Sequence, residues 1–121
     1  MRLEEVGEFG LIARLEERVK EGWKGTSWRV AIGDDAAVWE EADGSLRVWT
    51  ADLLVEGVHF LATVAMEDLG WKALAVNLSD LAAMGARPLG ALVTLALPPQ
   101  RSVEEVEALY RGLMLCGQRF A

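Results

Sequence analysis

The chain has 121 residues, of which 52% are hydrophobic and 26% are charged, and this composition predicts one globular domain and excludes a disordered chain. The net charge is -7 and the twelve Lys and Arg residues are scattered, which argues against nucleic acid as a partner, and no apolar run is long enough to span a membrane. A single cysteine and an acidic N-terminus exclude an internal disulfide and a signal peptide, so we expect a cytoplasmic protein.

The first third of the chain predicts a helix followed by two short strands. Apolar residues recur every three to four positions between Phe9 and Val19, which indicates a helix over the first twenty residues. Residues 28–32 and 36–40 are predicted as strands on either side of a Gly-Asp-Asp turn. The dipeptide Asp43-Gly44 then predicts a tight hairpin turn.

The remaining sequence predicts two more strands and two helices. A run of β-forming residues extends over 46–60, a helix is predicted over 65–85, and the apolar run 89–97 is typical of a buried strand. Ser102 and Glu105 form the capping box of a final helix. The predicted fold is α/β (α+β), with a mixed four-stranded sheet backed by helices in a single domain over residues 1–121.

Three acidic segments lie in apolar sequence: Gly33-Asp34-Asp35-Ala36-Ala37, Thr50-Ala51-Asp52 and Asn77-Leu78-Ser79-Asp80. Carboxylates are rarely buried unless they are paired or bind a metal. Several carboxylates brought together also repel one another and resist ionisation. A hard cation such as Mg²⁺ offsets this repulsion and commonly bridges carboxylates to phosphates. The three segments therefore suggest a site for a metal and a phosphate.

Each acidic segment also has a structural interpretation that the residues alone leave open. The pair Asp34-Asp35 could bond the backbone of its own turn. Asp52 could be a charge on an edge strand that discourages aggregation. Asn77 and Asp80 are three residues apart and share a helix face, so they could form an internal hydrogen-bond network.

Other reactive side chains carry weaker signals. His59 is the only histidine, and it lies two residues after Gly57, a residue that indicates a bulge or a close backbone approach. A structural role is the alternative interpretation of this histidine. Cys116 lies on the last predicted helix, on the side of Leu113, and is predicted to be a core thiol. Ser79 lacks the G-x-S-x-G context of a nucleophile, so no catalytic nucleophile is predicted.

Taken together, these motifs resemble the N-terminal domain of thiamine-monophosphate kinase, within the superfamily of aminoimidazole-ribonucleotide synthetase. The resemblance rests on Gly33–Ala37, Thr50–Phe60 and Lys72–Pro88. The core Asp-Leu-Ala-Ala-Met-Gly-Ala is shared across the superfamily, whereas Val-Glu-Gly-Val-His-Phe and Asn-Leu-Ser-Asp favour the thiamine-phosphate enzyme. The resemblance implies ATP-dependent phosphorylation of thiamine monophosphate to thiamine diphosphate.

The resemblance also implies a set of metal ligands. Asp35, Asp52 and Asp80 match the carboxylates that hold Mg²⁺ around the ATP phosphates. Thr50, which shares a strand face with Asp52, matches a further ligand position. Ala51 stands where relatives often carry Ser or Thr, so a ligand at this position would be its backbone carbonyl. Family resemblance implies direct transfer of the phosphoryl group without a covalent enzyme intermediate.

Two further residues match positions that contact the substrates. His59 matches the position that contacts the thiamine phosphate, and Tyr110 matches an aromatic residue beside the nucleotide. Relatives continue into a Gly-Gly-Asp-Thr segment and a C-terminal domain, neither of which occurs in the 121 residues, so we expect the isolated chain to be inactive. The alternatives are another ATP-dependent enzyme of the superfamily, such as a selenophosphate synthetase, or a catalytically silent dimerisation or binding domain.

Self-association is predicted from the apolar residues of the two long β-forming runs. Residues of both parities are apolar in 46–60 and 89–97, so each run has two faces to cover, and the predicted helices suffice for only one face. In relatives, the N-terminal sheets pair across a twofold axis. We therefore expect a homodimer built through the sheet.

Overall fold

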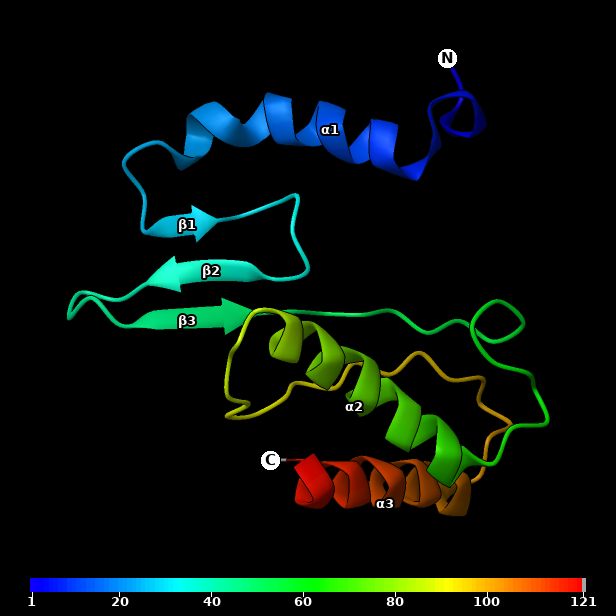
Figure 1. Cartoon of the computed structure of the whole chain (residues 1–121). Coiled ribbons are helices and arrows are strands. Elements are labelled where there is room, and N and C mark those ends of the chain that lie inside the picture. Colours follow the sequence, from blue (N-terminus) through cyan, green and yellow to red (C-terminus); the bar gives the residue numbers. More distant parts are fainter. Residues whose placement is uncertain (121) are drawn as a thin grey trace. The chain divides into compact units, whose positions relative to one another are not determined.

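The computed structural model describes residues 1–120, and the chain divides into two compact units, Met1–Thr50 and Ala51–Ala121. The first unit contains α1 (Leu3–Trp23), β1 (Trp28–Val30), β2 (Ala37–Glu40) and β3 (Leu46–Trp49). The second contains α2 (Met66–Ala83) and α3 (Val103–Phe120), joined by long irregular segments (Figure 1). No helix among the described residues is long and apolar enough to cross a membrane.

The sheet of the first unit is a three-stranded antiparallel meander in the order β1-β2-β3. The predicted hairpin turn is confirmed, because the Glu41 amide donates to the Ser45 carbonyl over 2.8 Å and Gly44 adopts a positive φ of 83°. Trp28 and Trp39 pair across β1 and β2 with their ring centroids 4.9 Å apart, edge to face. These contacts hold the strands beside the Gly-Asp-Asp turn that joins β1 to β2.

The first helix is confirmed but is not continuous. Gly7 has φ 72° inside α1, which breaks the helix near its start, and no residue of α1 is buried. The buried side chains of this unit are Ala36, directly before β2, and Val38 within it.

The core of the second unit is the crossing of α2 over α3 (Figure 1). Gly70 and Gly112 lie at this crossing. A Cβ atom on Gly70 would stand 1.9 Å from the Leu109 carbonyl oxygen, and one on Gly112 would stand 1.8 Å from the Glu67 carbonyl oxygen. The two backbones therefore approach more closely than any larger residue allows. Leu109 is 5% exposed and Cys116 is 0% exposed, so the predicted core thiol is confirmed.

The ends of both helices follow from sequence signals. Gly85 adopts φ 67° after α2, and the amides of Gly85 and Ala86 donate back to the carbonyls of Ala82 and Leu81. The predicted capping box of α3 is also confirmed. The Ser102 amide donates to Glu105 Oε2 over 2.8 Å, and the Glu105 amide donates to Ser102 Oγ over 3.2 Å.

The α/β class is confirmed, but the prediction of a mixed four-stranded sheet is wrong for residues 1–120. The sheet there has three strands, all antiparallel, and β3 ends at Trp49. Residues 50–60 and 89–97 lie outside the named strands, and the first segment contains one isolated bridge between Glu56 and Phe60. A strand needs hydrogen bonds to a neighbouring strand, and a β-forming composition cannot supply that neighbour.

Candidate metal and substrate site

The structure brings together two of the predicted carboxylates, Asp52 and Asp80. Asp52 lies in the irregular segment after β3, and Asp80 lies near the end of α2, so both belong to the second unit. The pKa of Asp52 is raised above its usual value. The largest cause is partial burial, followed by a hydrogen bond with the Asp80 side chain and by the negative charge of Asp80. Two acids in such contact favour a shared proton or a cation.

Asn77 adds an amide oxygen on the helix face that carries Asp80. Its Nδ2 donates to the Ala73 carbonyl over 2.9 Å, which is the local backbone bond expected of a polar residue inside a helix. Its Oδ1 is buried and has no hydrogen-bond partner among the described residues. An unsatisfied buried acceptor costs free energy unless a donor or a cation reaches it.

These groups suit Mg²⁺ chemically, because they are all oxygen donors and two of them are carboxylates. Within residues 1–120, no three His, Cys, Asp or Glu side chains are grouped so that they could hold a metal ion. Proteins commonly hold Mg²⁺ through one or two carboxylates, with phosphate oxygens and water completing the shell. The pair therefore fits a metal ion that arrives together with a phosphorylated ligand.

Asp35 lies in the first unit, in the turn between β1 and β2, so its position relative to Asp52 and Asp80 stays a prediction. The Asp35 amide donates to Asp34 Oδ1 over 2.8 Å. Asp34 thus has the turn-forming role that was its structural interpretation, and Asp35 is exposed. Thr50 ends the first unit and Ala51 begins the second, directly before Asp52 in the chain.

His59 lies in a tight loop instead of the predicted strand, and residues 55–60 are called the His59 loop below. Gly57 adopts φ 78° and its amide donates to the Phe60 carbonyl over 2.7 Å. This is the close backbone approach that Gly57 indicated. The Val55 amide donates to His59 Nδ1 over 2.8 Å, so the ring is bound to its own loop.

Two cationic residues fasten the His59 loop to the helices of the same unit. Lys72 Nζ, from α2, donates to the His59 carbonyl. Arg101, just before α3, donates to Glu56 over 2.7 Å and to Glu105 over 2.8 Å. Hydrogen bonds from the Ser102 backbone and then from Arg101 lower the pKa of Glu105, so this carboxylate stays charged. Sequence reasoning missed Lys72, Arg101 and Glu56, because these contacts join residues 13 and 45 positions apart.

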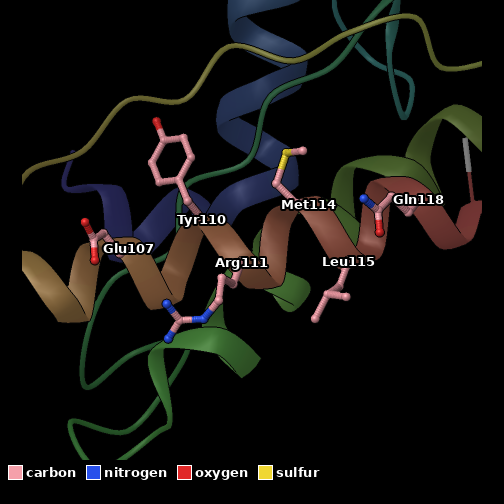
Figure 2. A pocket seen from close by; sticks show the side chains of 6 residues that line it. All are labelled: Glu107, Tyr110, Arg111, Met114, Leu115 and Gln118. Carbon is pink, nitrogen blue, oxygen red and sulfur yellow. The ribbon is translucent and has the colours of Figure 1, made fainter.

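Tyr110 lies on α3 and lines a shallow hollow on the exposed side of that helix (Figure 2). The other lining residues are Glu107, Arg111, Met114, Leu115 and Gln118. Figure 2 shows Tyr110 and Met114 on one side of the helix, and Arg111 and Leu115 on another. The Tyr110 side chain is 45% exposed, so its ring offers a face on which a planar base can stack. All six lining residues come from one helix.

Several known proteins that are similar to this chain share one activity name. The family described as AIR synthase related protein, N-terminal domain, matches residues 33–121. Thiamine-monophosphate kinase of Synechococcus elongatus is 40% identical over 119 residues, which are 98% of this chain and 34% of that protein. The enzyme of the same name from Aquifex aeolicus is 42% identical over 113 residues, which are 93% of this chain and 34% of that protein.

A solved structure extends the similarity to three dimensions. The structure described as AaThiL complexed with AMPPCP and TMP has a TM-score of 0.86 and 40% sequence identity to this chain. The match covers 99% of this chain and 36% of that one. The chain thus spans about a third of the length of the proteins that it matches.

Proposed function

The chain belongs to the family of AIR synthase related proteins, whose N-terminal domain it matches, and from this premise we propose that it supplies the ATP- and magnesium-binding part of a thiamine-monophosphate kinase. The reaction is the transfer of a phosphoryl group from ATP to thiamine monophosphate, giving ADP and thiamine diphosphate. The similarity to curated thiamine-monophosphate kinases and to a structure complexed with AMPPCP and TMP supports this reaction. In this proposal, residues 1–121 form one functional domain of that enzyme.

The contact between Asp52 and Asp80 is the observation that carries the proposal for this chain's own residues. Both reactants are anionic, so bringing them together requires cations more than it requires a strong base. Bound Mg²⁺ would offset the repulsion between the phosphates. Asp52 and Asp80 would hold the ion from the second unit, and Asn77 Oδ1 is a buried acceptor that a cation or a hydrogen-bond donor would satisfy. Asp35, the Thr50 hydroxyl and the Ala51 carbonyl complete the proposed ligand set.

The substrates have separate proposed contacts. His59 binds the phosphate of thiamine monophosphate, and the exposed ring of Tyr110 stacks beside the nucleotide. Neither role requires a covalent intermediate, so the chain orients the acceptor phosphate and the γ-phosphate of ATP for in-line transfer. The use of ATP supports a cytoplasmic location.

A second copy of the chain is the proposed partner of the exposed apolar segments. Leu92 is 99% exposed, and Leu53 and Val58 are also exposed. Pairing of residues 50–60 and 89–97 with the same segments of another copy would provide the missing neighbouring strands and cover these side chains. This supports a homodimer through the sheet.

Calorimetric titration of residues 1–121 with AMPPCP, with and without Mg²⁺, tests the magnesium and nucleotide site. We expect binding that requires Mg²⁺, and Asp80→Asn is expected to weaken it about tenfold or more, because a carboxylate ligand becomes neutral. Asp68→Asn is the matched control, since it makes the same change of charge on an exposed residue of α2. An equal loss of affinity in both variants, or AMPPCP binding that is the same with and without Mg²⁺, would contradict the proposed site.

Turnover needs a separate test, because the relatives are about three times as long as this chain. We expect residues 1–121 alone to form no thiamine diphosphate from ATP and thiamine monophosphate. The chain joined to the remaining two thirds of a relative is expected to restore the reaction, and Asp52→Asn in that fusion is expected to abolish it. A fusion that binds both substrates but forms no product would contradict the proposed activity.

A further inference from the structure

The His59 loop is held by bonds from three different parts of the second unit. Inside the loop, the Val55 amide donates to His59 Nδ1 over 2.8 Å. From α2, Lys72 Nζ donates to the His59 carbonyl. From the start of α3, Arg101 donates to Glu56 over 2.7 Å, while its other terminal nitrogen binds Glu105 over 2.8 Å. The loop is exposed and turns tightly at Gly57, which has a positive φ. Because little packing holds such an exposed loop, these hydrogen bonds define its conformation.

The bond from Val55 also determines the protonation pattern of the His59 ring. A ring nitrogen accepts a hydrogen bond only when it carries no proton. With Nδ1 accepting, the neutral imidazole must carry its proton on Nε2. The His59 ring therefore offers a hydrogen-bond donor, Nε2–H, to a ligand.

We propose that Arg101 and Lys72 are positioning residues that hold the His59 loop, so that His59 presents Nε2–H to an anionic oxygen of the substrate. The role rests on the proposed binding of thiamine monophosphate at His59. Arg101 acts through Glu56, and Lys72 acts through the backbone carbonyl of His59. Lys72 also brings a positive charge next to the residue that receives the phosphate.

Arg101 is the sharper test of the two, because its hydrogen bond to the loop is made to the Glu56 carboxylate and not to His59 itself. Its side chain is 25% exposed and is shared between Glu56 and Glu105, so it fixes the loop against α3. An exposed ion pair contributes little to global stability. Removing the guanidinium is therefore expected to loosen the loop and to leave the α2–α3 pair folded.

Nitrogen NMR of the labelled 121-residue chain reads the proposed state directly, because His59 is the only histidine. At about pH 8, where an ordinary imidazole is neutral, we expect a protonated Nε2 and an unprotonated Nδ1. In Arg101→Gln the chemical shifts of the two ring nitrogens are expected to approach each other, as in a free ring whose two neutral tautomers interconvert. The Val55 amide is expected to lose its protection from hydrogen exchange. Arg101→Lys, which keeps one positive charge, is expected to restore the pattern in part.

Arg119→Gln is the matched control. It removes a guanidinium near the end of α3 that lies over the Phe120 ring, 5.2 Å from the ring centroid, and it is expected to leave the His59 pattern unchanged. The reactivity of the buried Cys116 thiol reports whether each variant keeps the helix pair folded. An unchanged His59 pattern in folded Arg101→Gln, or a protonated Nδ1 in the unsubstituted chain, would overturn the proposal.

Titration of the same signals with thiamine monophosphate separates this proposal from the proposed function. We expect Arg101→Gln to weaken binding about fivefold, Arg101→Lys to have an intermediate affinity, and Arg119→Gln to bind as the unsubstituted chain does. Equal affinity in the unsubstituted chain and Arg101→Gln would overturn the positioning role in binding. If the unsubstituted chain shows the expected ring pattern but binds no thiamine monophosphate, the proposed substrate contact fails, and the loop-holding role is then decided by the Arg101→Gln pattern alone.

Discussion

The helix pair α2–α3 and the irregular segment 86–100 between the two helices are both rich in apolar residues, but the helix pair buries some of them whereas the segment buries none. Leu109 on α3 is 5% exposed, whereas Leu92 in the segment is 99% exposed. A helix satisfies its own backbone hydrogen bonds and needs only a complementary surface, which the glycines of the two helices provide. An extended segment also needs a neighbouring backbone. Apolar composition thus indicates which residues can be buried. Whether they are buried depends on whether a neighbouring segment is present to pack against them.

Gly112→Ala is expected to have the largest effect, because it breaks the closest approach of the helix pair. Its Cβ would stand 1.8 Å from the Glu67 carbonyl oxygen, so the helices must separate. We expect a loss of about 2 kcal/mol in the free energy of unfolding, although alanine favours a helix over glycine by about 1 kcal/mol. Urea unfolding followed by circular dichroism measures the loss.

Gly117→Ala on the same helix is the control for that prediction. Its Cβ would meet Leu74 Cδ2 at 3.6 Å, which is an ordinary contact. This variant is expected to be as stable as the unsubstituted chain or more stable by up to about 1 kcal/mol. Equal destabilisation at both positions would show that the crossing is not the sensitive point.

Leu92→Asp tests the other side of the comparison. If a second copy covers the segment, a charge at Leu92 is expected to weaken self-association about tenfold or more and to leave the helix content unchanged. Thr63→Asp adds the same charge at an exposed loop position and is expected to have little effect. Sedimentation at micromolar concentration distinguishes the two. An unsubstituted chain that stays monomeric would contradict the proposed pairing.

Ser102→Ala tests the boundary where the irregular segment ends and α3 begins. The Ser102 hydroxyl accepts the Glu105 amide over 3.2 Å, and its loss is expected to destabilise the protein by about 1 kcal/mol. Ser79→Ala, at an exposed position inside α2, is expected to change the free energy of unfolding by less than about 0.5 kcal/mol. Thermal unfolding of both variants checks the difference.

Asp80→Asn is expected to have the smallest effect on stability, and its sign depends on pH. The raised pKa of Asp52 means that the folded chain holds this proton more tightly than the unfolded chain. The pair therefore contributes stability at low pH, which is lost as the pH rises through the folded pKa of Asp52. Without Mg²⁺, Asp80→Asn is expected to be more stable than the unsubstituted chain at pH 7, by up to about 0.5 kcal/mol.

The pH profile gives the control for this sign. The gain in the free energy of unfolding of Asp80→Asn should vanish at about pH 3, where carboxyl groups of ordinary pKa are protonated in the variant and in the unsubstituted chain. Asp68→Asn on the same helix should show no such gain. A loss of stability in Asp80→Asn at neutral pH would contradict repulsion between the two carboxylates.

The predicted helices, hairpin turn and capping box are confirmed because each depends on residues close in sequence. Ser102 and Glu105 specify a helix start within three positions, and Asp43-Gly44 specifies a turn within two. The predicted strand over 46–60 is confirmed only at 46–49, and the predicted strand over 89–97 is wrong, because β-forming residues such as Val55 and Leu92 carry no information about a pairing partner. Lys72 and Arg101 gave no local signal at all, since their role depends on contacts with a loop far away in the chain.

By itself, the sequence determined the positions of the helices, their caps, the tight turns and the candidate carboxylates, because helical periodicity, glycine conformation and side-chain caps act over a few residues. Only the tertiary structure decided that Asp52 and Asp80 meet, that Gly70 and Gly112 allow α2 and α3 to touch, and that Arg101 and Lys72 hold the His59 loop. These contacts depend on how the chain returns to itself. The physical reason is that side-chain packing and hydrogen bonding between distant segments act through distances in space, which no local pattern of residues encodes.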